Sequence, residues 1–374
     1  MPADWDRIRR EFPALENWTF LNTATFGQLA RRTTEAVAKH FAHRDELACH
    51  DFLHWFDDAD AIRGSIARLI HADAADIAFC TASSWALSLL LGGLPWDKGG
   101  RVVTFQNEFP NHVYYPSLLA ARGVEFVETD WEGFEAALTP ETRLVILSTV
   151  NYTNGFRPPI EEIAALLRRR GILLYCDATQ SLGALPFDVR RIRPDVLAVH
   201  GYKWLLAPSG SAFAYFSPEM RRVLEPNIVG WRSHKDWRNV DRLHHGAPEF
   251  KESAERYEGG MLPFPLIYAM GASVEMMLEI GPAEIESRVL SLAERCRETL
   301  RALGARLISD ERPHFDSGIV VATWPGRDAS RLARELKERR VLVSARHGNL
   351  RVSVHFYNNE EDLDRLGTEL RKLL

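Results

Sequence analysis

Short apolar runs alternate with longer stretches of helical pattern from residue 77 onwards. The runs are continuous rather than mixed with polar residues, which is typical of strands that helices cover on both faces of a sheet. We predict strands at 77–80, 101–105, 124–128, 144–148, 172–176, 196–200 and 211–216. Helices are predicted between them at 84–91, 114–121 and 160–170, among others, and Gly171 caps the last of these. This order predicts an α/β fold with an open, mostly parallel sheet flanked by helices.

The pattern loosens near residue 260, which indicates a second, smaller α+β domain. Further apolar runs occupy 317–324, 341–345 and 350–356. Further helices are predicted at 4–15, 266–304, 329–340 and 359–374. The first of them places Trp5, Ile8 and Phe12 on one face, and the longest is broken once, at Gly281 and Pro282. We expect a large domain at 18–262 and a small domain formed by 1–17 and 263–374.

The composition is that of an ordinary globular protein. The chain has 374 residues, of which 46% are hydrophobic and 26% charged, so it has enough apolar surface for a large core. Its 46 basic and 51 acidic residues give a net charge of −5, which argues against a nucleic-acid partner or a membrane surface. No apolar stretch is long enough to span a bilayer, and the N-terminus has no signal-peptide pattern. We therefore expect a cytoplasmic protein.

Cysteines and histidines are the residues that could bind a metal ion. The four cysteines stand far apart, which excludes a disulfide scaffold and a thiolate zinc site and fits a reducing compartment: Cys49, Cys80, Cys176 and Cys296. His50 and His54 have the i, i+4 spacing of a zinc-protease helix, with His40 and His43 upstream. Asp51 is shorter than the glutamate of that motif, and no third ligand is evident. A packed helix explains the segment better, so we expect no metal site.

Candidate catalytic residues follow the predicted strands, at the edge where ligands bind in sheets of this type. Asp177 follows the strand at 172–176, Lys203 follows the strand at 196–200, and Ser83 and Ser84 open the first helix after a strand. Each has an ordinary explanation alone, as a turn residue, a surface lysine or a helix cap. Together they provide what pyridoxal phosphate requires: an amine for a Schiff base, an acid for the pyridine nitrogen, and hydroxyl and N–H groups for the phosphate.

Longer segments around these residues resemble a known family. The segments are LLYCDATQSLGALPFDV, VLAVHGYKWLLAPSGSAFAYF, FLNTATFGQL, EFPNHVYYPSL, TNGFRPPI and LRVSVHFYNNEEDLDRL. Together they resemble the class V aminotransferase family of pyridoxal-phosphate enzymes of fold type I, which includes cysteine desulfurases, selenocysteine lyases, kynureninases and isopenicillin N epimerases. The resemblance implies a large cofactor-binding domain, a small C-terminal domain and a homodimer with shared active sites. Glycine-bearing segments at 230–231 and 259–261 are the candidates for contact with the partner.

The resemblance also implies roles for individual residues. Lys203 would form the Schiff base with pyridoxal 5'-phosphate and later move a proton at the substrate α-carbon, while Asp177 would pair with the pyridinium nitrogen. Arg351 matches the arginine that grips the carboxylate of an amino-acid substrate, the alternative being a surface arginine on an edge strand. The other implied residues are Ser83, Ser84 and His200 at the phosphate, Phe109 over the ring, Gln180 at the ring 3-oxygen and Asn22 at the substrate.

The chain departs from the desulfurases of this family at three places. Phe109 stands where they carry a histidine, Tyr152 stands where they carry an asparagine, and no cysteine lies between Asp310 and Arg351, where they carry the nucleophile. The favoured interpretation is therefore an aminotransferase, epimerase or C–S lyase that acts at the α-carbon of an amino acid. A cysteine desulfurase or selenocysteine lyase, and a protein that retains the cofactor without catalysis, are the alternatives.

Overall fold

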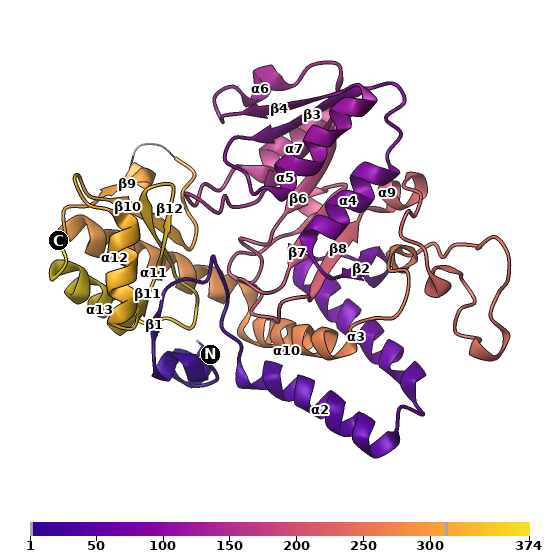
Figure 1. Cartoon of the computed structure of the whole chain (residues 1–374), viewed down its shortest axis with the longest axis horizontal. Helices are drawn as coiled ribbons and strands as arrows, with labels where there is room; N and C mark the ends of the chain where they lie inside the picture. Colours follow the sequence, from indigo (N-terminus) through magenta and orange to yellow (C-terminus); the bar gives the residue numbers. More distant parts are fainter. Residues whose placement is uncertain (1–2, 311–312) are drawn as a thin grey trace.

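Seven strands form one sheet in the larger part of the molecule (Figure 1). The structure is a computed structural model that describes residues 3–310 and 313–374. In spatial order the strands are β2 (Ile77–Cys80), β8 (Ala212–Phe216), β7 (Val196–His200), β6 (Leu173–Asp177), β5 (Thr142–Ser148), β3 (Gly100–Phe105) and β4 (Val124–Thr129). Strand β8 runs opposite to the other six strands of this sheet, which are all parallel to one another. The predicted mostly parallel sheet is confirmed, and every strand lies within two residues of its predicted bounds.

Helices cover both faces of this sheet because successive residues of a strand point to opposite sides. Val103 and Leu147 belong to one core, with side chains of α3 (Phe52–Ile70), α7 (Ile160–Arg169) and α10 (Phe264–Ile280). Their neighbours Val102 and Ile146 belong to a second core with side chains of α4 (Ser83–Gly93). Burial on both sides explains why the strands have continuous apolar sequences.

A second, antiparallel sheet forms the smaller part of the molecule (Figure 1). Its strands are, in order, β12 (Ser344–Arg346), β13 (Asn349–Ser353), β10 (Ile319–Thr323) and β9 (Arg306–Leu307). A third apolar core joins it to α11 (Pro282–Ala302), α12 (Ala329–Glu338) and α13 (Glu360–Arg371). By contrast, α10 packs against α2 (Arg31–Leu47) and α3. The packing therefore changes near Gly281, one helix after the domain boundary predicted at residue 262.

The N-terminal segment runs from the small sheet to the large one. Helix α1 (Trp5–Arg9) is shorter than the helix predicted at 4–15, because Pro13 begins a separate 3-10 turn at Pro13–Glu16. Strand β1 (Thr19–Phe20) then pairs in parallel with β11 (Val341–Leu342). The chain continues from this pair towards the edge of the large sheet, as Figure 1 shows between the two parts of the molecule.

The shorter helices lie in the connections of the large sheet: α5 (Asn111–Leu118), α6 (Phe134–Ala137), α8 (Val189–Ile192) and α9 (Pro218–Val223). None of the helices in the described parts of the chain is long and apolar enough to cross a membrane. The zinc-protease spacing of His50 and His54 does not lie on one helix, because α3 begins at Phe52. His43 Nε2 instead lies 2.9 Å from Asp51 Oδ2.

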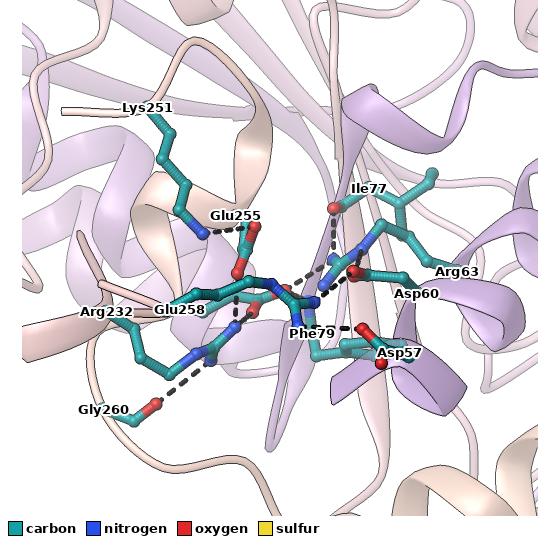
Figure 2. A network of polar contacts seen from close by, with 11 residues as sticks. Asp57, Asp60, Arg63, Ile77, Phe79, Arg232, Lys251, Glu255, Glu258 and Gly260 are labelled. Atoms are coloured by element: carbon teal, nitrogen blue, oxygen red, sulfur yellow. Dashed lines mark hydrogen bonds and ion pairs between the residues drawn. The ribbon is translucent and has the colours of Figure 1, made fainter. Parts of the chain in front are cut away.

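A buried ion network fastens the segment at 224–262 to α3 and to the edge strand β2 (Figure 2). The fully buried Glu258 carboxylate accepts hydrogen bonds from Arg63 Nη1 at 2.6 Å and Arg232 Nη2 at 3.0 Å. It also accepts the backbone N–H of Phe79 at 2.8 Å, and Arg232 Nη2 lies 2.6 Å from Glu255 Oε1. An edge strand leaves backbone groups unpaired, and Glu258 satisfies one of them here.

Candidate active site

Three neighbouring strands bring polar residues to one edge of the large sheet. Ser148 ends β5 and Asp177 ends β6, and the two residues are paired in the sheet register. His200 ends β7, and Lys203 follows in the next turn. Because these strands are parallel, their carboxyl ends meet at the same edge, where ligands bind in open α/β sheets. The structure thus brings the predicted acid and the predicted amine to one place.

Lys203 is a buried amine without a counter-ion. The residue is 6% exposed, and no described residue makes a hydrogen bond or ion pair with its Nζ atom. Nζ lies 5.3 Å from the ring centroid of Phe109 and 5.3 Å from that of Tyr202. Burial lowers the pKa of Lys203 to about 8. The negative charge of Asp177 raises this pKa, while the positive charges of Arg351 and Arg346 lower it further. A fraction of the amine is therefore neutral and nucleophilic near neutral pH.

The N-terminal segment packs directly on the turn that carries Lys203. Gly27 donates its backbone N–H to the Tyr202 carbonyl oxygen at 2.8 Å. A Cβ atom at Gly27 would lie 2.0 Å from the Lys203 carbonyl oxygen, so only glycine allows this approach. This explains the glycine in FLNTATFGQL, one of the segments that carry the family resemblance.

Asp177 is held as a charged carboxylate. Its Oδ1 atom accepts the backbone N–H of Thr179 at 2.8 Å, and its Oδ2 atom lies 3.5 Å from His112 Nε2. Burial alone would raise the pKa of Asp177, but His112 and Thr179 lower it to about 2. The charge is present throughout the physiological pH range, as the pairing with a pyridinium nitrogen requires.

Glu108 and His112 lie behind Asp177, and the sequence analysis missed both. His112 Nδ1 lies 3.1 Å from Glu108 Oε2, and its exposed fraction is 1%. Glu108 accepts from Ser148 twice, from the backbone N–H at 2.8 Å and from the hydroxyl at 2.6 Å. The available signal was the i, i+4 spacing of an acid and a histidine within EFPNHVYYPSL.

The start of α4 presents hydroxyl and N–H groups. Ser83 is buried and Ser84 half-buried in its first turn, and no side chain caps the helix. The free N–H groups and the helix dipole favour an anion there. His200, the third residue predicted at the phosphate, accepts the Gly210 N–H at Nε2 over 3.4 Å, and burial lowers its pKa.

Phe109 and Gln180, two further residues predicted at the cofactor, differ in how far the protein already engages their side chains. Phe109 is 37% exposed and meets the Tyr152 ring edge-on at 5.3 Å. Gln180 is buried and already engaged, since its Nε2 donates to the Ala24 carbonyl oxygen at 3.0 Å and its Oε1 accepts from Trp204 Nε1 at 2.8 Å. Phe109 is thus free to pack against a ligand, whereas Gln180 also ties the N-terminal segment to the site.

Arg351 lies in β13 between β12 and β10 and is 1% exposed, so it is not a surface arginine on an edge strand. It donates to three neutral oxygens: Ser344 Oγ at 3.1 Å, Thr25 Oγ1 at 2.8 Å and the carbonyl oxygen of Tyr152. No carboxylate among the described residues pairs with it. Burial lowers the pKa of Arg351 to about 9, and the charge of Arg346 adds to this. The guanidinium therefore lacks an anion inside the protein.

Thr25 links two arginines and the predicted substrate residue Asn22. Its hydroxyl donates to Asn22 Oδ1 at 2.9 Å and accepts from Arg351 at 2.8 Å, while Arg346 Nη2 lies 3.5 Å away. Asn22 thus reaches Arg351 through Thr25. Thr25 and Arg346 were also missed, because a threonine in a loop and an arginine beside a turn carry no spacing signal.

The residues at this edge fit pyridoxal phosphate. They supply a buried amine without an acid partner, a carboxylate that stays charged, and an uncapped helix start with two serines. These are the three groups that the aldehyde, the ring nitrogen and the phosphate of that cofactor need. Arg351 adds a fourth feature, a buried guanidinium of the kind that binds carboxylates, with no carboxylate of the described residues on it.

Comparison with known proteins agrees with this chemistry. A family model described as aminotransferase class-V matches residues 22–366. The chain is 30% identical to isopenicillin N epimerase of Streptomyces clavuligerus over 397 aligned positions, which cover 99% of this chain and 98% of that enzyme. It is 26% identical to a protein of Methanothermobacter thermautotrophicus named "Probable cysteine desulfurase", and the alignment covers 98% of this chain and 97% of that protein. The solved structure of the cystine C–S lyase C-DES with cysteine persulfide superposes with a TM-score of 0.88 at 24% identity, covering 96% of this chain and 99% of the other, which confirms the fold.

Proposed function

The chain belongs to the class V aminotransferase family, and from this premise we propose that it uses pyridoxal 5'-phosphate to transform an amino acid at its α-carbon. The reaction is a transamination, an epimerisation or a C–S lysis. The observation that carries the proposal is Lys203: a buried lysine with a lowered pKa and no counter-ion, on the same sheet edge as a charged aspartate. Such an amine is costly to bury unless its chemistry is used.

Six residues would hold the cofactor together with Lys203. We assign Asp177 to the ring nitrogen and Phe109 to the face of the ring. Ser83, Ser84 and His200 take the phosphate, with the N–H groups that begin α4. We assign Gln180, which is hydrogen-bonded to both Ala24 and Trp204, to the ring oxygen. When bound, the cofactor supplies an electron sink for the bonding pair released at the α-carbon.

The remaining residues act on the amino acid. Arg351 binds the α-carboxylate through its guanidinium, with Asn22 and Thr25 fixing the orientation of that group. With the carboxylate held in place, the bond that breaks at the α-carbon is the C–H bond and not the C–C bond to the carboxylate. Lys203, once its amine is free, takes and returns the proton at the α-carbon, and its pKa of about 8 suits that task near neutral pH.

The test is covalent labelling of the lysine. The purified protein should be yellow, and borohydride reduction followed by peptide mapping should fix a pyridoxyl group on Lys203 alone. The Lys203→Ala variant should carry no label, while Lys251→Arg, a change at another partly buried lysine, should label like the parent. A colourless protein that takes up no added pyridoxal phosphate would refute the proposal.

A cysteine desulfurase or selenocysteine lyase is the second candidate, since several relatives bear the name "Probable cysteine desulfurase". Persulfide chemistry needs an accessible thiolate. Cys80, Cys176 and Cys296 are buried with raised thiol pKa values, and Cys49 is remote, between α2 and α3. A cofactor-retaining protein without catalysis is less favoured, because Lys203 and Arg351 are both present and buried.

We also propose that the enzyme is a cytoplasmic homodimer. The segments at 230–231 and 259–261 are the candidates for contact with the partner. They lie side by side, since the Arg232 N–H donates to the Gly259 carbonyl oxygen at 3.1 Å, and Met261 exposes 61% of its surface there. The free cysteines support a reducing compartment. Sedimentation should give twice the chain mass, and an active monomer would exclude an active site shared between subunits.

A further inference from the structure

A chain of three ionisable groups runs inward from the Asp177 carboxylate. His112 Nε2 lies 3.5 Å from Asp177 Oδ2, and His112 Nδ1 lies 3.1 Å from Glu108 Oε2. Glu108 is anchored on its far side by the N–H and hydroxyl of Ser148, and it also accepts the Phe109 N–H at 3.3 Å. The side chains of His112 and Glu108 are 1% and 2% exposed, so water does not screen these charges.

The charges of this cluster do not cancel. A protonated His112 between two carboxylates gives one positive and two negative charges, hence one net negative charge. A buried net charge is costly unless something neutralises it. Asp177 is the only member that reaches the edge where the proposed cofactor sits, with 10% of its side chain exposed. A protonated pyridine nitrogen would supply the missing positive charge.

Other titratable groups around the cluster do not supply that charge. Tyr175 meets the His112 ring edge-on at 5.9 Å, and burial raises its pKa, as it does for Cys176 on the same strand and Cys80 on β2. These three groups are therefore neutral. His200 on β7 lies near Asp177, but burial lowers its pKa, so its ring is neutral at neutral pH. Lys203, with a pKa of about 8, is mostly cationic at pH 7 in the protein without cofactor, but its amine is the group that would bond to the cofactor.

We propose that His112, held by Glu108, is a positioning residue that keeps Asp177 charged and thereby keeps the cofactor ring nitrogen protonated. The inference rests on the proposed function and goes beyond it, because it assigns the charge balance of the site to a pair that touches neither cofactor nor substrate. Without His112, two carboxylates would share one buried site, and one of them would take a proton. A protonated Asp177 no longer attracts a proton to the ring nitrogen.

The pKa directions agree with this geometry. Burial would lower the pKa of His112, but Glu108 and Asp177 raise it to about 10, so the imidazole is cationic at neutral pH. Burial would raise the pKa of Asp177, but His112 is the strongest influence that lowers it. Loss of the cation should therefore move the Asp177 pKa upward.

The experiment compares three variants that change the net charge by design. His112→Gln leaves two carboxylates and no cation, and Glu108→Gln leaves a neutral pair. The double variant Glu108→Gln/His112→Gln restores one net negative charge with no ionised histidine. His40→Gln, at another buried histidine far from the site, is the control. Two protonation states are followed by NMR over pH 6 to 9. The first is that of the ring nitrogen, measured with ¹⁵N-labelled pyridoxal phosphate in the loaded protein. The second is that of His112, measured in the protein without cofactor.

In the parent and in His40→Gln, we expect the ring nitrogen to stay protonated over this range. In His112→Gln it should lose its proton at lower pH, and kcat/KM should fall at least ~tenfold at pH 8. The double variant should regain protonation and come within about threefold of the parent, a non-additive result that damage to packing would not give. If His112→Gln does not fold but the double variant does, charge balance is the requirement and the proposal stands.

Three results would overturn the proposal: a ring nitrogen that stays protonated in His112→Gln, a neutral His112 at pH 7 in the parent, or a double variant that is as defective as the single one or unfolded. All of them leave the proposed function intact, since the parent would still bind cofactor at Lys203. Failure of the parent to bind pyridoxal phosphate would instead refute the function itself.

Discussion

At the scale of single residues, the site contains two buried cations that no carboxylate of the described residues contacts. Lys203 and Arg351 are both buried cations without a carboxylate beside them, and burial lowers the pKa of each. Unpaired buried charges destabilise a fold. Their retention is explained when each meets an anion or reacts during the catalytic cycle.

Replacing Arg351 with lysine tests the carboxylate contact. Lysine keeps the positive charge but cannot form the planar fork of two hydrogen bonds, each worth ~1.5–3 kcal/mol to a charged group. We expect a folded, yellow protein whose kcat/KM is lower by roughly a hundredfold or more, with slow decarboxylation as a new side reaction. Steady-state kinetics and product analysis measure both, and parental kinetics would show that another group holds the carboxylate.

Replacing Asp177 with asparagine tests the ring-nitrogen contact. The shape and the Thr179 hydrogen bond persist, but the charge is lost. We expect bound cofactor and a loss of turnover of several powers of ten, since each ~1.4 kcal/mol of lost stabilisation is tenfold. Single-turnover kinetics on the loaded protein provide the measurement. Near-normal turnover would contradict the assigned role.

The sequence was informative at this scale only where a residue follows a strand. Asp177 and Lys203 could be predicted because strand ends define a ligand edge. For His112, the i, i+4 spacing from Glu108 was visible, but its significance depends on Asp177, a residue far away in the sequence. Thr25 could not be predicted, since its hydroxyl becomes significant only when Arg351 folds against it.

At the scale of elements, the long buried strands were predictable and the short ones were not. Most strands of the large sheet have continuous apolar runs, which burial on both faces explains, whereas the edge strand β4 alternates with the exposed Glu125 and Glu128. Strands β1, β9 and β11 have two residues each, too few for any periodicity to appear. Helix α5 begins three residues before its predicted start, and Pro116 inside it weakened the helical pattern.

The ion network of Figure 2 leads to a prediction at the scale of elements. Glu258→Gln keeps the shape but leaves Arg63 and Arg232 buried with one fewer carboxylate. Breaking a buried ion pair in this way costs ~3–5 kcal/mol, so the free energy of unfolding should fall by about that amount. Glu219→Gln, which breaks a pair exposed on both sides, is the control and should change it by less than ~1 kcal/mol. Urea denaturation measures both variants, and equal effects would mean that the network does not anchor the 224–262 segment.

At the scale of the whole molecule, the placement of the cysteines separates the candidate reactions. Each of the four single Cys→Ser variants should retain most of the activity, because none of the four lies in the segment before Arg351 where a persulfide nucleophile is expected. Activity assays, with mass spectrometry for trapped persulfide, give the readout. A variant that is inactive, at a cysteine that carries persulfide in the parent, would establish the desulfurase alternative.

The path of the N-terminal segment also determines when the site is completed during synthesis. Thr25 and Arg351 contact each other although 326 residues separate them in the chain. At 5–20 residues per second, a ribosome needs roughly 16–65 s to make the arginine after the threonine. Phe12 also lacks its packing partners until late in synthesis, because the rings that it contacts belong to Phe356 and Tyr357. The last strand of the large sheet, β8, ends at Phe216, which is 135 residues before Arg351. The nascent protein therefore holds a finished large sheet and an uncovered N-terminal apolar segment for roughly 7–27 s, and Arg351 meets Thr25 only after β13 has left the ribosome.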